Sequence, residues 1–385
     1  MKVGFDLSAI LYGRGVSHYT SNLFLALAKL PDLELFGYAS AGRGQGTLRT
    51  QLQKLAAQLD DPAKEIFWHN LTLQKIPPKL NHLLWHYFKL NSLRSHLPDL
   101  DVFHSWDYLQ PPDKNLPLVS TIHDLAILKD PHLAHPEILR HHQESWRILR
   151  QRHAHLIAVS QQTQTDIIKL LHFDPSHVHL VYEALPTDNL IEEKELKNQD
   201  ISVIRQKFNL SLPYFLFVGT REPRKNLTRL IRAWQPLANQ TALVLVGAHG
   251  WEEPTLAHPN LHILPPVSDF DLALLYHFAL ALTYPSLDEG FGLPILEAFY
   301  YHTPVLTSQN TATAEVAGNA AILIDPFNQD KITRGLQQLQ QLNSKEKTNL
   351  ITAGATQLRQ FSWQKAARQT LAVYQLAAQE KTAHA

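Results

Sequence analysis

Short apolar runs alternate with helix-length amphipathic stretches along this chain, first in one half and again in the other. Such alternation is typical of buried parallel strands joined by crossover helices, and it predicts an α/β fold with parallel sheets. In the first half the expected strands are Lys2–Leu7, Leu33–Tyr38, Val102–His104, Leu118–Ile122 and Leu156–Val159, with a helix near Ser17–Lys29. In the second half they are Phe215–Val218, Leu243–Gly247, His262–Leu264, Ala279–Tyr284, Pro304–Thr307 and Ala321–Ile324.

The length predicts two domains. At 385 residues the chain exceeds one ordinary hydrophobic core, and a hydrophobic content of 44% is sufficient for two. The polar stretch 186–213, which contains IEEKELKNQD, separates the two alternating halves. We therefore expect one domain at 1–185, a linker at 186–213 and a second domain at 214–362.

The composition excludes several classes of protein. The chain has no cysteine, which rules out disulfides, thiolate catalysis and cysteine-based zinc clusters. Its formal net charge is zero, which argues against general nucleic-acid affinity. The start, MKVGFDLSAI, lacks the apolar block of a secretory signal, and the apolar stretch Leu272–Tyr284 is too short to span a bilayer. We therefore expect a cytoplasmic protein.

The stretch Pro285–Phe299, PSLDEGFGLPILEAF, carries two carboxylates eight positions apart, Glu289 and Glu297. Its glycines follow an expected buried strand and allow backbone amides to face outward at the start of the next helix, where anions bind well. Pro294 suits the first helical turn, so Glu289 is expected in the loop and Glu297 just inside the helix. One carboxylate could contact a transferred group while the other contacts a ribose.

A second stretch, Tyr214–Asn226, supplies the opposite charge. Its sequence, YFLFVGTREPRKN, is an apolar strand that ends in glycine, followed by a turn with three cations and then a helix at Leu227–Trp234. Arginine offers a planar fork and lysine a point charge, and both suit a diphosphate at the carboxyl end of a strand. A solvated basic turn is the alternative, and the acidic loop makes it less favoured. The cations are Arg221, Arg224 and Lys225.

Together these stretches resemble glycosyltransferase family 4, the retaining nucleotide-sugar transferases of GT-B fold, in particular its mannosyltransferase-like branch. The pair of glutamates in EGFGLPILE and the motif GTREPRKN are the most specific features. The resemblance covers nearly the whole chain. Its segments are GRGVSHYTSNL (Gly13–Leu23), STIHDLAIL (Ser120–Leu128), IAVSQQTQTDI (Ile157–Ile167), VGTREPRKNL (Val218–Leu227), the glutamate pair, TPVLTSQNTATAEVAGNAAILIDP (Thr303–Pro326) and FSWQKAARQTLAVY (Phe361–Tyr374).

The resemblance implies two facing Rossmann-like domains with parallel sheets and a cleft between them, and a final helix, 363–385, that returns to the first domain. It also implies roles for single residues. Catalytic roles fall to Arg224, Lys225, Glu289 and His123, the last placed next to the donor hexose. Donor-binding roles fall to Gly15, Gly219, Arg221, Gly290, Phe291, Gly292, Leu293 and Glu297, with Glu297 on the ribose hydroxyls.

The chain departs from the family pattern at three positions. Ser17 stands where many members have a second glycine, near the loop that approaches the donor phosphates. Thr220 replaces an arginine of some relatives, which leaves the phosphate role mainly to Arg224 and Lys225. Ala184 replaces a usual glycine in VYEALP, and no binding role is assigned to that stretch. For His123, the alternative is a solvent-facing side chain beside a helix cap at Asp124.

The 22 histidines raise the question of a metal site. The pairs considered lack the His-x3-His spacing and the accompanying carboxylate of a helical zinc motif, so no metal is expected. Asp99 and Asp101 resemble a metal-binding Asp-x-Asp pair but precede an expected strand, and they are interpreted as turn residues. The histidine pairs are His132 with His135, His141 with His142, and His153 with His155.

The segment 75–97, KIPPKLNHLLWHYFKLNSLRSHL, combines apolar and basic residues with no acid. A basic amphipathic helix of this kind can lie on an anionic membrane, where a lipid-linked acceptor would be found. The favoured interpretation is the buried face of a domain helix. A peripheral membrane contact is the alternative.

The expected function is retaining, metal-independent transfer of a hexosyl group from a nucleoside diphosphate sugar to a hydroxyl of a glycan, lipid-linked or small-molecule acceptor. GDP-mannose is the first expected donor and a UDP-hexose the second, with no cofactor and no nucleic-acid partner. The alternatives are a non-catalytic nucleotide-sugar-binding protein, and an epimerase or phosphorylase of the same fold. The acceptor depends on variable loops that fold-level likeness does not determine.

Overall fold

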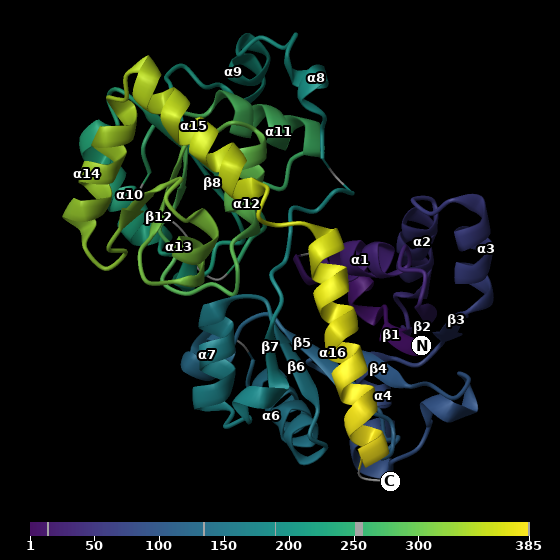
Figure 1. Cartoon of the computed structure of the whole chain (residues 1–385). Helices are drawn as coiled ribbons and strands as arrows, with labels where there is room; N and C mark the ends of the chain where they lie inside the picture. The colour runs from purple at the N-terminus through teal and green to yellow at the C-terminus, as the bar shows by residue number, and fades with distance from the viewer. Residues whose placement is uncertain (14, 134, 189, 251–256, 384–385) are drawn as a thin grey trace. The chain divides into compact units, whose positions relative to one another are not determined.

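A computed structural model describes residues 1–13, 15–133, 135–188, 190–250 and 257–383 (Figure 1). The chain forms two compact units. Unit 1 comprises Met1–Asp188 and Ser362–Ala385, and unit 2 comprises Asn189–Phe361. Most of the stretch expected as a linker, 186–213, groups with unit 2 and contains two short helices, α8 (Glu193–Leu196) and α9 (Ser202–Phe208).

Unit 1 is built on a seven-stranded parallel sheet in the order β3-β2-β1-β4-β5-β6-β7. The five strands expected in this half are present. The sequence pattern missed β3 and β7, because both are very short strands at the edges of the sheet. The strands are β1 (Lys2–Asp6), β2 (Glu34–Ser40), β3 (Leu71–Gln74), β4 (Val102–Trp106), β5 (Leu118–Ile122), β6 (His155–Ala158) and β7 (Val178–Leu180).

The last helix, α16 (Trp363–Ala383), packs against α1 (Gly15–Leu27) and strands β4, β5 and β6 of unit 1 (Figure 1). Trp363 Nε1 donates to the carbonyl of Leu185 at 2.8 Å, which fixes the first turn of α16. The other α-helices of unit 1 are α2 (Gln45–Ala56), α3 (Asp61–His69), α4 (Pro78–His82), α5 (Ala126–Lys129), α6 (Pro136–Gln151) and α7 (Gln161–Leu170).

Segment 75–97 does not form the single amphipathic helix predicted for it. Helix α4 continues into a π-helical stretch, Leu83–Phe88, which ends where Lys89 adopts a left-handed conformation (φ 54°), and a 3-10 turn follows at Leu93–Ser95. The segment is therefore broken, and its helical part carries both buried and exposed side chains. Trp85, Leu93 and Leu97 lie in the core, whereas Leu80, Leu83, Tyr87, Phe88 and Leu90 are exposed.

Unit 2 contains a six-stranded parallel sheet in the order β10-β9-β8-β11-β12-β13, and all six strands were expected. The strands are β8 (Tyr214–Val218), β9 (Ala242–Val246), β10 (Leu261–Leu264), β11 (Ala281–Tyr284), β12 (Val305–Ser308) and β13 (Ile322–Ile324). The helices are α10 (Leu227–Trp234), α11 (Asp269–Phe278), α12 (Leu293–Tyr300), α13 (Ala312–Ala317), α14 (Gln329–Gln340) and α15 (Ser344–Leu358).

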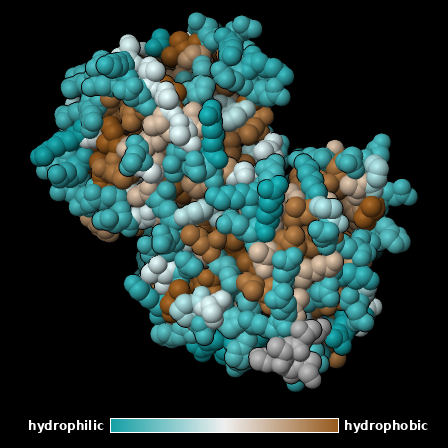
Figure 2. Space-filling model, in the orientation of Figure 1, coloured by the Kyte–Doolittle hydropathy of each residue, from teal (hydrophilic) through white to brown (hydrophobic). Residues whose placement is uncertain are grey.

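The core of unit 2 centres on β8, whose residues Phe215, Leu216 and Phe217 are fully buried. A central parallel strand covered on both faces needs this continuous apolar sequence. Hydrophilic side chains occupy most of the visible surface of each unit, with smaller apolar areas among them (Figure 2). Within the described ranges, no helix is long and apolar enough to cross a lipid bilayer.

Candidate active site

The basic turn and the acidic loop meet because β8 and β11 are neighbours in the sheet of unit 2. Parallel strands deliver their carboxyl-terminal loops to the same edge. After β8, a 3-10 turn at Pro223–Lys225 leads to Asn226, which adopts a left-handed conformation (φ 63°) at the start of α10. The side-chain amide of Asn226 donates to the carbonyls of Pro285 (3.0 Å) and Pro326 (2.8 Å). This residue fastens the basic turn to the acidic loop.

Glu289 is held by two cations. Its Oε2 accepts from Arg224 Nη1 at 2.7 Å, and its Oε1 accepts from Lys225 Nζ at 2.5 Å. Lys225 also donates to the hydroxyl of Tyr284 at the end of β11, and Arg224 Nε pairs with Glu222 at 2.8 Å. Lys225 and Glu289 are each 7% exposed. Three of the residues expected to be catalytic therefore form one buried, charged cluster.

The surroundings keep this cluster ionised. Burial alone would raise the pKa of Glu289, but the charges of Lys225 and Arg224 outweigh it and hold that pKa at about 2. Burial lowers the pKa of Lys225, and the carboxylate of Glu289 opposes that shift. Buried charges of this kind are stable only when paired and hydrogen-bonded. The cluster is thus a preformed site of strong, oriented electrostatics.

Backbone packing fixes the loop after β8. Gly219 has φ +151°, and its N–H donates to Val246 at the end of β9 (2.9 Å). A β-carbon on Gly247 would lie 2.1 Å from the carbonyl oxygen of Gly219, and one on Gly250 would lie 1.8 Å from that of Arg221. Only glycine permits this approach of the two loops. The strand ending in VLVG gave the signal that could have identified Gly247. Arg221 itself is buried.

The acidic loop leads into α12 as the sequence predicted. Gly292 has φ +118° and caps the helix, Leu293 is its first residue, and Pro294 lies in the first turn. Gly290 and Phe291 are buried, and the Phe291 ring packs edge-on against Phe361. The loop is therefore a rigid, closely packed segment.

Glu297 is half-buried in the middle of α12, and its Oε2 accepts from the Tyr276 hydroxyl of α11 at 2.6 Å. Glu297 lies in the same unit as the charged cluster, but its hydrogen-bond partner is Tyr276 and not a residue of that cluster.

Gly15 and His123 belong to unit 1. Gly15 is the first residue of α1. Ser17, which stands where the family has glycine, turns its hydroxyl inward: it donates to the carbonyl of Ala9 (2.8 Å) and accepts from the N–H of Gly13 (2.7 Å). The side chain therefore binds the preceding loop.

His123 follows β5, and its Nδ1 lies 2.8 Å from a carboxylate oxygen of Glu183. The ring packs edge-on against Tyr19. Burial lowers the pKa of His123, but the hydrogen bond to Glu183 and its charge raise it by more, so the pKa lies above its ordinary value. A merely solvent-facing histidine is thereby excluded. Glu183 lies in VYEALP, a stretch given no role from sequence, and it is the orienting partner that sequence reasoning missed.

A small pocket of unit 1 contains His123 beside buried polar residues that sequence reasoning did not select. Burial raises the pKa of Asp6, at the end of β1, to about 6, although hydrogen bonds from Ser8 oppose the rise. Burial lowers the pKa of His104 to about 3, so its ring is neutral. His104 connects Tyr374 of α16 (2.6 Å) with Thr121 of β5 (2.9 Å), which is a structural link through the core.

Comparison with known proteins identifies the family. Residues 14–189 match the family model Glycosyltransferase Family 4, and residues 199–357 match Glycosyl transferases group 1. The O-antigen chain mannosyltransferase B of Escherichia coli is 32% identical over 272 residues, covering 67% of this chain and 70% of that protein. The chain belongs to glycosyltransferase family 4. The predicted family and the α/β fold with two Rossmann-like domains are confirmed, and the protein is a glycosyltransferase.

Two further relatives agree with this assignment. The O-antigen chain mannosyltransferase RfbU of Salmonella typhimurium is 28% identical over 196 residues, covering 49% of this glycosyltransferase and 51% of that protein. The solved structure of Anabaena Alr3699/HepE in complex with UDP and glucose has a TM-score of 0.66 at 17% identity, covering 96% of this chain and 98% of that one. At that identity the structural likeness establishes the fold.

Proposed function

We propose that this glycosyltransferase moves a hexosyl group, mannosyl by preference, from a nucleoside diphosphate sugar to a hydroxyl of an acceptor. The anomeric configuration is retained and the transfer needs no metal. GDP-mannose is the first proposed donor and a UDP-hexose the second. The names of the two O-antigen mannosyltransferases support the sugar, and the UDP and glucose bound by HepE support a donor of the nucleotide class.

The single observation that carries the proposal is the pairing of Arg224 and Lys225 with Glu289 at the carboxyl edge of the unit 2 sheet. Rupture of the bond between sugar and phosphate places negative charge on the departing diphosphate. Fixed cations stabilise that charge more in the transition state than in the ground state, which is the condition for a faster reaction. Arg224 and Lys225 supply the charge that a metal ion supplies in other transferases.

Glu289 pairs with both cations in the structure. We propose that the diphosphate takes over part of this pairing, because phosphate oxygens accept from Arg and Lys as carboxylate oxygens do. Glu289 then accepts from hydroxyls of the hexose. On this proposal the carboxylate keeps the cations in place between turnovers and orients the sugar during transfer.

We propose retention without a covalent intermediate, because double displacement needs a carboxylate nucleophile at the anomeric carbon and the described part of the chain assigns none there. In the proposed step the bond from the anomeric carbon to phosphate breaks, and a bond to the acceptor oxygen forms on the same face. The departing diphosphate takes the acceptor proton.

The remaining residues receive donor-binding roles by family resemblance. His123, oriented by Glu183, would bind a hexose hydroxyl, and Glu297 would bind the ribose hydroxyls. The backbone of the acidic loop would position sugar and phosphate at the start of α12. The other proposed donor-binding residues are Gly15, Gly219, Arg221, Gly290, Phe291, Gly292 and Leu293.

The acceptor proposal rests on segment 75–97 of unit 1. Its exposed apolar residues Leu83, Tyr87, Phe88 and Leu90 adjoin the cation Lys89 in a stretch without acids. Exposed aromatic and basic residues together suit an anionic bilayer, which would present a lipid-linked glycan. Flotation with anionic liposomes tests this contact, with Phe88→Ser expected to weaken binding and the equally exposed Ile66→Ser on α3 expected to leave it unchanged. Absence of wild-type binding at low salt would remove the proposal.

Transfer assays on the full chain test the function. GDP-mannose and UDP-hexoses are offered in turn with a glycan acceptor in EDTA, and nuclear magnetic resonance reads the anomeric configuration of the product. The expected result is transfer with retention from one donor despite EDTA. Inversion, or loss of turnover on chelation, would contradict the mechanism. Donor binding without transfer or hydrolysis would indicate a binding protein, and phosphate-dependent release of sugar phosphate would indicate a phosphorylase.

A further inference from the structure

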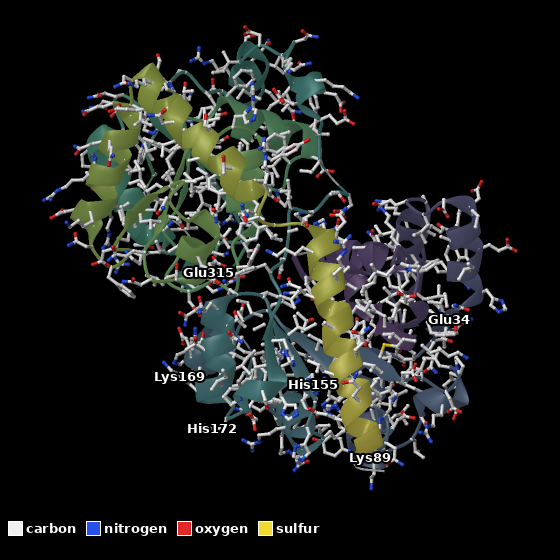
Figure 3. All side chains as sticks on the ribbon, viewed as in Figure 1. Glu34, Lys89, His155, Lys169, His172 and Glu315 are labelled. Carbon is white, nitrogen blue, oxygen red and sulfur yellow. The ribbon has the colours of Figure 1, made fainter. Side chains whose placement is uncertain are left out.

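Histidines from two neighbouring strands converge on Glu380 at the amino edge of the unit 1 sheet. His155 is the first residue of β6, and His177 immediately precedes β7. Glu380 lies near the end of α16, which packs on β6 and passes beside His155 (Figure 3). His123 follows the carboxyl end of β5, so this cluster occupies the opposite edge of the sheet.

The distances match a metal-binding geometry. Oε2 of Glu380 lies 3.2 Å from Nε2 of His155 and 3.1 Å from Nε2 of His177. Ligands that bind Zn²⁺ tetrahedrally at about 2.0–2.1 Å are separated by roughly 3.3 Å. His155 Nε2 is buried and makes no well-aligned hydrogen bond within the described part of the chain. The three potential ligand atoms all lie within 4.8 Å of one another.

The other ring nitrogen of His155, Nδ1, has a hydrogen-bond partner. Its Nδ1 lies 2.9 Å from Nε2 of His179, and the two rings stack. When His155 Nδ1 donates this hydrogen bond, its Nε2 presents a lone pair toward Glu380. Histidines that bind metals usually donate their second ring N–H in this way, which fixes the tautomer and the ring orientation. His179 is then a positioning residue.

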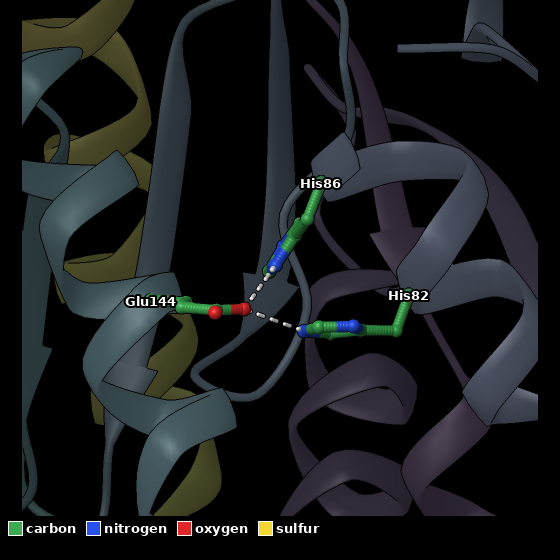
Figure 4. A group of neighbouring side chains, drawn as sticks. All are labelled: His82, His86 and Glu144. Carbon is green, nitrogen blue, oxygen red and sulfur yellow. Dashed lines mark ion pairs between the residues drawn. The ribbon is translucent and has the colours of Figure 1, made fainter. Parts of the chain in front are cut away.

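A second group in unit 1, His82 and His86 with Glu144, gives a contrast (Figure 4). His82 and His86 have the His-x3-His spacing, which sequence reasoning missed. His86 Nε2, however, accepts from the backbone N–H of Gln110 at 3.1 Å. The neutral ring therefore carries its proton on Nδ1, the nitrogen that faces Glu144 at 3.9 Å. That nitrogen is unsuited to bind a metal while the Gln110 bond persists.

We infer that His155, His177 and Glu380 bind a divalent transition-metal ion, with Zn²⁺ as the preferred ion and water in the remaining position. Two imidazoles and one carboxylate are a ligand set that Zn²⁺ accepts. The same ligand types also suit Cu²⁺ and Ni²⁺. The ion ties the end of α16 to β6 and β7. The site lies at the opposite edge of the sheet from His123 and takes no part in the proposed glycosyl transfer.

Titration of the full chain, stripped with EDTA and without an affinity tag, with ZnCl2 tests the inference. Calorimetry is expected to show one tight site, and saturating Zn²⁺ is expected to raise the melting temperature. Co²⁺ in its place is expected to give the visible absorption of a tetrahedral complex. His155→Gln, His177→Gln and Glu380→Gln are expected to abolish the site, and His179→Gln is expected to weaken it about 10- to 100-fold.

His82→Gln is the matched control, because it removes one ligand from the other two-histidine, one-carboxylate group. It is expected to leave Zn²⁺ affinity unchanged. Glu380 is half exposed, so Glu380→Gln keeps the fold and preserves a hydrogen-bond acceptor for His177 while removing the anionic ligand. Wild-type protein that binds no Zn²⁺, or affinity that survives Glu380→Gln and disappears in His82→Gln, would overturn the inference.

Discussion

The polar sites of the two units differ in the ionisation state that the surroundings favour for their buried groups. In unit 2, Lys225 and Glu289 are buried as ions and Arg224 is half-buried, each paired within hydrogen-bond distance. In the pocket of unit 1, burial raises the pKa of Asp6 and lowers that of His104, so both shifts favour the neutral form. The same physical effect, desolvation, operates in both places. Opposite charges overcome it in the unit 2 cluster and at His123 of unit 1, whose partner is Glu183, but not at Asp6 or His104.

This difference indicates that the two sites are suited to different parts of a substrate. A cluster of fixed ions is suited to the charge that develops on a departing diphosphate. A pocket lined by hydrogen-bonding groups is suited to hydroxyls, which carry no charge and need donors and acceptors in defined positions. The following variants test the comparison, beginning with the largest expected effect.

Removal of the lysine charge is expected to have the largest effect on turnover. Lys225→Ala takes away a cation proposed to stabilise the leaving group, and loss of such a group lowers kcat by about 10²–10³-fold. Steady-state kinetics with the best donor measures this. Lys345→Ala, an exposed lysine of α15 in the same unit, is the control and is expected to retain full activity. Equal activity of the two variants would remove the charged cluster from the mechanism.

Neutralisation of the carboxylate is expected to destabilise the fold. Glu289→Gln leaves two cations at a buried site without their counter-charge, and breaking a buried pair in this way costs about 3–5 kcal/mol. Urea unfolding of both proteins at pH 7 measures the difference. A loss of unfolding free energy below about 1 kcal/mol would mean that Arg224 and Lys225 find other partners. The ion pairs of unit 2 would then contribute less than the comparison of the two units requires.

The same pair predicts how wild-type stability depends on acid. The folded-state pKa of Glu289, about 2, lies below its ordinary value of 4.5, so its contribution is complete above pH 4.5 and is lost as the pH falls toward 2. Glu289→Gln is expected to remove this part of the acid dependence. Identical pH profiles of unfolding free energy below pH 4.5 would contradict the shift.

A smaller effect is expected in unit 1. His123→Ala removes one hydrogen bond to a hexose hydroxyl and is expected to lower kcat/KM about 2- to 10-fold, since a hydrogen bond to a neutral partner contributes about 0.5–1.5 kcal/mol. His69→Ala, at the exposed end of α3, is the control. Unchanged kinetics in His123→Ala would leave Glu183 and His123 as a structural pair.

The smallest effect is expected from Asp6. Its folded-state pKa of about 6 lies above the ordinary 3.8, so its contribution to stability is complete below pH 3.8 and is lost as the pH rises through 6. Asp6→Asn removes this loss and is expected to stabilise the protein at pH 7 but hardly at pH 4. Thermal melts at both pH values measure it, and destabilisation at pH 7 would contradict the raised pKa.

Much of unit 2 could be predicted from the sequence because its signals are local. Every strand there is a short apolar run between turn residues, and the two loops that carry Lys225 and Glu289 follow directly from neighbouring strands. Asn226 could not be selected, because its role depends on Pro285 and Pro326, which lie far away in the sequence and meet it only in the fold. The same holds for Glu183, which acts through His123.

Segment 75–97 shows that apolar periodicity alone does not predict where a helix ends. Its apolar spacing indicated one amphipathic helix, but Lys89 and Asn91 adopt left-handed conformations that end the helix, and tertiary packing of Trp85 and Leu93 decides which part is buried. Edge strands β3 and β7 escaped detection for a related reason, since pairing with a neighbouring strand rather than sequence makes them strands.

The affinity for a free nucleoside diphosphate tests the central claim most directly, because it reads the charged cluster without any acceptor or chemistry. GDP and UDP are titrated calorimetrically into the full chain, into Lys225→Ala and into the control Lys345→Ala. We predict that one diphosphate binds the wild type and the control equally and binds Lys225→Ala at least tenfold more weakly. Equal affinity of all three proteins for that diphosphate would contradict the assignment of the basic turn as the diphosphate site.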